Sequence, residues 1–183
     1  MAKIGLNNFR YSVLTEEDGV ASYNGAKSLG KAIECKVAIE KYEAELYADD
    51  SLAESDYTFK KGTITLTIDE DDDTVFAELL GHEVDSESGE MVRKDTDVAP
   101  YVGVGRILTK LVNGVQKYKV EFLPKVKFSE PEQEEATKGD SIEFKTPSVE
   151  GTVVKLENGI WSRAKTFTSK EEAISYLNSL MAK

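Results

Sequence analysis

The sequence contains very few of the residues that build metal sites and disulfides. Its 183 residues include one cysteine, Cys35, and one histidine, His82. One cysteine excludes an internal disulfide and a cysteine zinc cluster, and one histidine excludes the usual multi-histidine zinc sites. No apolar run approaches the roughly 18 residues that a membrane-spanning helix needs, and no apolar stretch follows the start as in a secretory signal. We therefore expect no metal, no cofactor, no membrane partner, and synthesis in the cytoplasm.

Positive charge is also scarce, because 23 Lys and Arg residues stand against 34 Asp and Glu residues, a formal net charge of −11. Nucleic-acid binding needs clustered Lys and Arg, so this balance argues against it. The charge is unevenly spread. Residues 40–95 hold 18 acidic and 5 basic side chains, a net of −13, whereas residues 101–128 hold 6 basic and 1 acidic, a net of +5. Copies of a chain with such oppositely charged segments can bind each other through them. The alternative is a soluble surface whose charges happen to alternate from segment to segment.

Alternating apolar residues predict that most of the chain forms β-strands. Apolar side chains occupy every second position over residues 33–39 and again over residues 63–68, as in half-buried strands. The alternation slips near Glu40 and Lys41, which predicts a bulge or a turn there. Residues 101–112 are apolar on both faces and include two glycines, which predicts a strand with close neighbours.

Two Asn-Gly pairs predict tight hairpins, because both residues tolerate the positive φ of a type I′ turn. The first pair, Asn113 and Gly114, should join residues 101–112 to residues 115–123. Pro124 follows, so the strand should kink there or lie at an edge. The second pair, residues 158–159, should join residues 149–156 to residues 160–167.

Two segments have helical signals. The first should run over residues 74–80 after Asp73 and end at Gly81. The second is a C-terminal helix over about residues 169–182, where residues 168–171 have the spacing of a capping box. Its apolar face should pack on the sheet, and its members are Ala173, Ile174, Leu177, Leu180 and Met181.

The remaining segments are polar. We expect an N-terminal arm over about residues 1–8 and a mobile loop over residues 129–140. Nothing marks a linker between two cores, so residues 1–183 should form a single domain.

Four motifs that could carry chemistry are incomplete. Residues 25–31 begin like a phosphate-binding loop, but Ala32 replaces the hydroxyl that holds magnesium and a strand pattern follows. Residues 103–108 lack the third glycine of a dinucleotide site, and residues 69–73 lack the glycine and glutamate of a calcium loop. His82 should be an exposed imidazole next to the end of the first helix. A catalytic pair of carboxylates, as in glycosidases, stays a possible site, because 34 acidic residues form many pairs. We expect no enzyme.

Several short segments carry information through their order and spacing over nearly the whole chain. They are residues 3–11, 25–31, 45–50, 54–56, 71–82, 98–103, 113–122 and 127–131, and the terminal helix after Trp161. In this order they resemble the major tail protein, or tail-tube protein, of long-tailed bacteriophages and related prophages. No appended immunoglobulin-like domain, which some of these proteins carry, is visible.

The resemblance implies a fold and a role. The fold would be mainly β with some α, an antiparallel β-sandwich or barrel of tail-tube type with a short flanking helix and a C-terminal helix. The chain would be a structural, non-enzymatic virion protein, assembled in the bacterial host cytoplasm into stacked rings, usually of six copies. Further partners would be the tape-measure, tail-terminator and distal tail proteins. Genomic DNA would pass through the lumen without specific binding, and an acidic wall would repel its phosphates.

Residues 40–60 are the candidate contact between subunits. The segment is too polar for a core strand pair, yet it keeps aromatic and aliphatic residues among acids, as contact surfaces do. The candidate interface residues are Tyr42, Leu46, Tyr47, Asp49, Asp50 and Leu52. The alternative is a merely mobile hairpin tip.

Two other function classes stay open. One is a carbohydrate- or host-binding β-sandwich carried on a virion, which would bind a glycan and would not polymerise. The other is a carboxylate-dependent hydrolase, whose turnover would disappear when one acidic pair is neutralised. The sequence has eight tyrosines but one tryptophan, so no tryptophan-lined sugar platform stands out.

Overall fold

The computed structural model of the chain describes residues 2–48, 51–69, 72–131 and 148–182, and their side chains apart from residues 2–4, 32, 43–48 and 51–57. Strands make up 56% of the residues and helices 13%, and the strands pair antiparallel, which confirms the predicted mainly-β class with a C-terminal helix. The elements in chain order are β1 (Ala2–Glu17), β2 (Val20–Tyr23), β3 (Lys27–Ser28), β4 (Ala32–Ala48), β5 (Ser51–Ile68), α1 (Asp73–Leu80), β6 (Glu83–Val84), β7 (Met91–Val92), β8 (Val102–Val112), β9 (Val115–Phe128), β10 (Ser148–Val153), β11 (Arg163–Phe167) and α2 (Lys170–Leu180).

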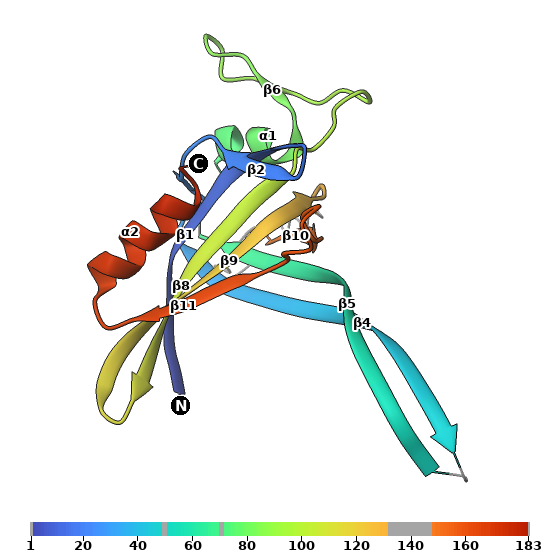
Figure 1. Cartoon of the computed structure of the whole chain (residues 1–183). Coiled ribbons are helices and arrows are strands. Elements are labelled where there is room, and N and C mark those ends of the chain that lie inside the picture. Colours follow the sequence, from blue (N-terminus) through green and yellow to red (C-terminus); the bar gives the residue numbers. More distant parts are fainter. Residues whose placement is uncertain (1, 49–50, 70–71, 132–147, 183) are drawn as a thin grey trace, which may run out of the picture.

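The main sheet has the strand order β2-β1-β8-β9-β10-β5-β4, with β11 beside β9 and β3 beside β1. The short strands β6 and β7 pair with each other in a separate hairpin above α1 (Figure 1). The sheet bends back over itself, so that β4 approaches β1, but in the described part of the chain it does not close into a barrel. This arrangement is consistent with a β-sandwich.

The larger core lies between the two halves of the bent sheet. The alternation predicted for β5 is confirmed, because Ile64, Leu66 and Ile68 point inward and are almost fully buried. Helix α1 closes this core with Phe76 and its neighbours. Its start is capped by Asp72, one residue earlier than expected, and Gly81 ends it in the left-handed region at φ 81°.

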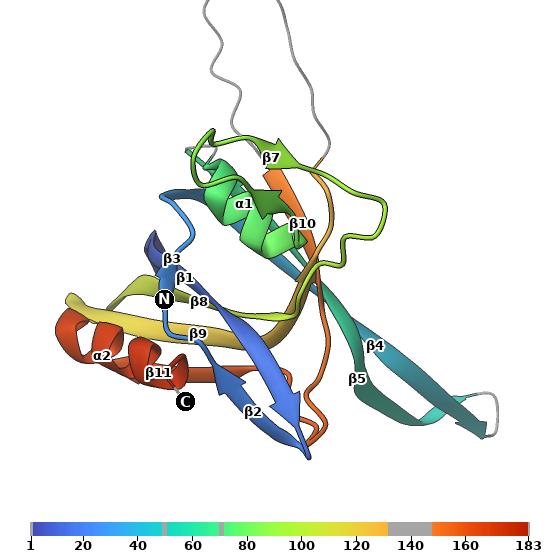
Figure 2. The same ribbon diagram turned by 90° about the horizontal axis from the view of Figure 1, so that it is seen from above.

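A second core lies on the other face of β8 and β9, beneath α2 (Figure 2). The predicted apolar face is confirmed: Ala173, Leu177 and Met181 are buried against the sheet. Gly105 of β8 makes this packing possible, because a Cβ there would lie 2.2 Å from Cδ1 of Leu177. Helix α2 is capped by Ser169, one residue after Thr168, where the capping-box spacing placed the cap; the Ser169 hydroxyl accepts from the amide of Glu172.

The first predicted hairpin is confirmed. Asn113 and Gly114 have φ of 51° and 79°, and the strands β8 and β9 pair from Val112 and Val115 onward. Pro124 marks the predicted kink, since the register slips by one residue between the partners of Val104 and Val102. On its other side β9 pairs β11 before the slip and β10 after it.

The second predicted hairpin is wrong. Of the pair at 158–159, Gly159 alone has a positive φ, of 84°, so the turn is not of type I′. The amide of Leu156 donates to the carbonyl of Ile160, but the chain then diverges. Strand β10 pairs β5 and β9, and β11 pairs β9. Strand β10 gains hydrogen bonds on both of its edges by lying between β5 and β9, which a hairpin with β11 alone would not give it.

Residues 2–8, which we expected to form an arm, belong to β1 and pair with β8 from Ala2 and Leu111 inward. Of the expected loop over 129–140, residues 132–140 lie outside the described residues. Among the described helices, none is long and apolar enough to cross a membrane.

Candidate assembly surface

The most prominent surface feature is the hairpin of β4 and β5. Strand β5 pairs β10 from Gly62 to Thr67, so this inner half belongs to the sheet. Farther out, among the described strands, β4 and β5 pair only with each other. There they project from the body as a two-stranded ribbon (Figures 1 and 2). We call residues 41–59 the ribbon. A lone pair of strands is only marginally stable in water, and its outer backbone groups are free to pair with another chain.

A β-bulge lies where the ribbon leaves the body. Glu40 pairs with Lys61, but the next residue, Lys41, pairs with Phe59, so Lys60 is the extra residue. This confirms the slip predicted at Glu40 and Lys41. A bulge bends its strand and increases the twist. The bulge therefore helps to set the direction in which the ribbon projects.

The root of the ribbon is packed against the body. The rings of Phe59 and Trp161 stack with centroids 4.7 Å apart and planes 4° apart. Trp161 comes from the connection between β10 and β11. At Gly62, an added Cβ would lie 2.9 Å from Cδ1 of Ile39 and 3.2 Å from Cβ of Val153, so the strands meet closely there. These contacts hold the base of the ribbon in one orientation.

The structure brings the predicted interface residues onto the ribbon as far as it describes them. The side chain of Tyr42 is 59% exposed, and Nζ of Lys60 lies 5.7 Å from its ring centroid. In the backbone ladder Leu46 pairs with Glu54 and Tyr47 with Leu52. The side chains of Leu46, Tyr47 and Leu52 lie outside the described residues, as do Asp49 and Asp50 entirely.

Strand β4 also forms an edge of the main sheet. In the described part of the chain no strand pairs with its outer side. The outward face beside this edge is polar and carries exposed or half-exposed side chains from β4, β5 and β10, namely Glu34, Lys36, Thr63, Thr65, Thr67, Glu150 and Thr152. An open edge with a polar face can extend a sheet into a second molecule.

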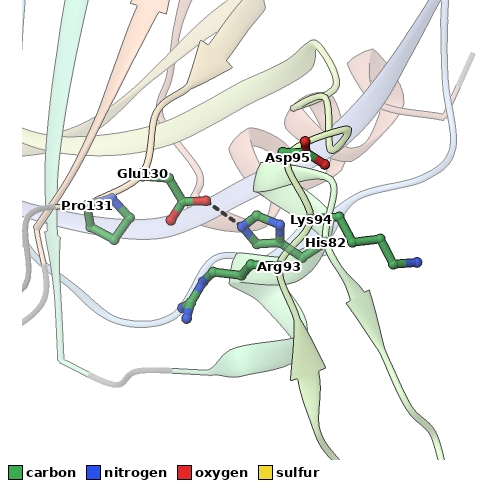
Figure 3. A pocket seen from close by; sticks show the side chains of 6 residues that line it. All are labelled: His82, Arg93, Lys94, Asp95, Glu130 and Pro131. Atoms are coloured by element: carbon green, nitrogen blue, oxygen red, sulfur yellow. Dashed lines mark hydrogen bonds and ion pairs between the residues drawn. The ribbon is translucent and has the colours of Figure 1, made fainter.

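A surface pocket of about 580 Å³ lies beyond the end of α1, and its lining is His82, Arg93, Lys94, Asp95, Glu130 and Pro131 (Figure 3). The exposed imidazole expected at His82 is wrong, because its side chain is 6% exposed. Nδ1 lies 2.7 Å from Oδ2 of Asp97, and Nε2 contacts a carboxylate oxygen of Glu130. The two acids come from segments 15 and 48 residues away, which no local sequence signal links to His82.

The two carboxylates change how this histidine titrates. The hydrogen bond to Asp97 raises the pKa of His82, burial opposes this, and Glu130 adds to the increase. The pKa of Asp97 is lowered, first by a hydrogen bond from the amide of Lys94 and then by His82. Since both ring nitrogens are engaged by carboxylates, neither is left to activate a nucleophile. The arrangement suits a cross-link between three segments better than acid–base catalysis.

A second polar cluster lies inside the sandwich and was not anticipated from the sequence. Arg106 donates from Nε and Nη2 to Oε2 of Glu121, at 3.1 and 2.6 Å, and from Nη1 to the Sγ of Cys35 at 2.7 Å. Burial raises the pKa of the Cys35 thiol, although Arg106 opposes the increase. This thiol is therefore a hydrogen-bond acceptor in the layer between β4 and β8. Among the described residues, no group of three histidine, cysteine or acidic side chains could hold a metal ion.

The glycine segment at 25–31 is not followed by a helix. Gly25 and Gly30 adopt positive φ of 92° and 101°, β3 lies between them, and β4 follows. Oδ1 of Asp69 accepts a hydrogen bond from the amide of Lys31 at 3.0 Å. The segment is thus a glycine turn. Asp69 also belongs to residues 69–73, the segment that resembles part of a calcium loop. Residues 70 and 71 of that segment lie outside the described residues.

No protein-family model matches the chain, and no curated protein matches it.

Proposed function

We propose that this chain is a major tail-tube subunit of a long-tailed bacteriophage or a related prophage. In this role it is a structural virion protein that polymerises into stacked rings, which we expect to contain six copies, around a conduit for the genome. The observation that carries the proposal is the ribbon. It extends well beyond the body, and its edges can complete their hydrogen bonds in a neighbouring copy.

The position of the ribbon favours a head-to-tail contact. The ribbon projects from the body, so a neighbouring copy can receive it on a surface other than its own ribbon. Such heterologous contacts close into rings or continue into filaments. The opposed charge blocks of residues 40–95 and 101–128 support the same geometry.

The remaining features agree with a passive conduit. With a net charge of −11, the subunit repels the phosphates of passing DNA and does not trap them. The proposed subunit performs no reaction, in keeping with the way both nitrogens of His82 are occupied. Its further partners would be the tape-measure, tail-terminator and distal tail proteins of the virion.

The test is assembly as a function of concentration. Purified protein should pass from monomers to tubes above a critical concentration, seen by light scattering and negative-stain electron microscopy. Replacement of Tyr47, Asp49 and Asp50 by Ala should leave the circular dichroism spectrum unchanged and weaken tube growth. The control is the pair E87A and D95A, which removes two exposed acids away from the ribbon and should assemble normally.

Two results would contradict the proposal. Normal tubes from the triple variant would remove the ribbon from the contact. A chain that stays monomeric at every concentration and binds a glycan on an array would instead favour the carbohydrate- or host-binding module.

A further inference from the structure

The end of the β8–β9 hairpin carries an unusual set of like charges. Lys110 and Lys117 are direct partners across the two strands, and Lys119 follows on the same face. We call these three residues the lysine strip. On the other side of β8, the register partner of Lys110 is Lys3 of β1. Like charges placed opposite each other destabilise a pair of strands, so this arrangement calls for a negative partner.

Among the described residues, little negative charge lies beside these lysines. Within the described part of the chain, neither Lys110 nor Lys117 has an ion pair. The carboxylate of Glu121 is shared by two cations farther along the same face. Lys119 donates to its Oε1 at 2.5 Å, and Arg106 donates to its Oε2 at 2.6 Å. Burial disfavours the charge of Glu121, yet these two donors outweigh it and lower its pKa. Among the described residues of β8 and β9, four cations thus share this face of the sheet with one carboxylate.

The lysine strip continues the face of the sheet that forms the core. Farther along the same face, Val104 and Leu123 are buried beneath the second layer. Arg106 still touches that layer through Cys35 of β4. Beyond it, the half-buried Lys110 and Lys117 take the place of apolar residues, next to the buried Leu108 and the exposed Val115. A partner that covers this surface must therefore offer carboxylates and some apolar contact.

The strands of the ribbon contain the acidic and apolar residues that such a partner needs. Residues 43–48 and 51–57 contain four acids, Glu43, Glu45, Glu54 and Asp56, and no Lys or Arg. The end of the β8–β9 hairpin lies to the left of the body and the tip of the ribbon to the right in both views, so they cannot meet within one copy (Figures 1 and 2). They can meet between copies arranged head to tail.

We infer that the acidic ribbon of one copy docks on the lysine strip of the next copy. This inference rests on the proposed assembly and names the surface that receives the ribbon. Opposite charges at such a contact select the correct partner and register. They also offset the repulsion between Lys110 and Lys117, which gives the unfavourable pair a role in the assembled state.

The test uses two charge-reversed variants. Variant A carries K110E and K117E, and variant B carries E54K and D56K. Alone, each places like charges at every contact, so its critical concentration should rise about tenfold or more. Mixed in equal amounts, A and B should grow tubes again, because each contact between an A copy and a B copy has opposite charges. The control K155E with K170E changes two exposed lysines elsewhere and should assemble as the wild type does.

Each outcome decides between the possibilities, provided that the circular dichroism spectra and melting temperatures of A and B match the wild type. If A assembles as well as the wild type, or if the mixture fails to recover, the lysine strip does not receive the ribbon, although the proposed function stands. If A assembles normally but loses binding to a short DNA duplex, the lysine strip binds phosphate instead. A wild type that never polymerises overturns both proposals.

Discussion

At His82, one imidazole holds three segments of the chain together. The residue follows the end of α1, Asp97 belongs to the segment that leads into β8, and Glu130 lies just beyond β9. Asp97 also accepts a hydrogen bond from the amide of Lys94 at 2.8 Å, which fixes its carboxylate towards the ring. The protonated imidazole can donate to both acids, so this cross-link is strongest when the ring is charged.

The cross-link predicts a pH-dependent contribution to stability. The folded state raises the pKa of His82, so its stabilisation is complete below the ordinary histidine pKa of about 6.5 and is lost as pH rises through the raised value. Urea unfolding should therefore show a larger loss for H82Q at about pH 5.5 than at about pH 8.5. A control, K155Q, should show no such trend. A difference that is independent of pH, or that grows with pH, would contradict the charged cross-link.

Individual residues also show where inference from the sequence ends. Gly81 acts locally, and its role as a helix stop was predictable, whereas the cap of α2 is Ser169, one residue after the predicted Thr168. The partners of His82 and the contact between Arg106 and Cys35 join residues far apart in the chain. Their spacing in the sequence contains no period or motif, so only the fold brings them together.

At the scale of elements, local signals predicted strands well and their partners less well. The bulge at the root of the ribbon and the turn at Asn113 and Gly114 follow from neighbouring residues, and both are present. The pairing of β10 with β11 was wrong, because an Asn-Gly pair fixes a turn but does not decide which strands lie beside it. Strand β10 fills the space between β5 and β9, which is a property of the whole sheet.

The ribbon should depend on the stack at its root. Replacing Phe59 by Leu keeps an apolar side chain but removes the ring that faces Trp161, and should cost about 1 kcal/mol of stability. Trp161 is the only tryptophan in the sequence, so its fluorescence reports this contact directly, and its emission should shift to longer wavelengths. F59Y keeps a ring and should retain both the stability and the emission.

In the proposed assembly, the stack would also affect tube growth. If the root positions the ribbon, F59L should raise the critical concentration for tube growth, and F59Y should not. Unchanged emission and unchanged growth in F59L would show that the bulge and the packing at Gly62 suffice to direct the ribbon.

At the scale of the whole molecule, a bent antiparallel sheet carries the ribbon and, well away from it, the basic end of the β8–β9 hairpin. The two cores, one beneath α1 and one beneath α2, hold these surfaces in a fixed relation. In the proposed assembly, the net charge of −11 would repel separate copies as wholes, whereas the opposed local charges would attract at contact. In the proposed assembly, subunits of this design would join end to side, as a tube requires.

The most direct measurement is a helical reconstruction, by electron cryo-microscopy, of tubes grown from the purified protein. It should show each β4–β5 ribbon lying against the body of a neighbouring copy, close to the end of that copy's β8–β9 hairpin. Tubes whose ribbons extend freely into solvent, or preparations in which every particle remains a single copy, would contradict the account.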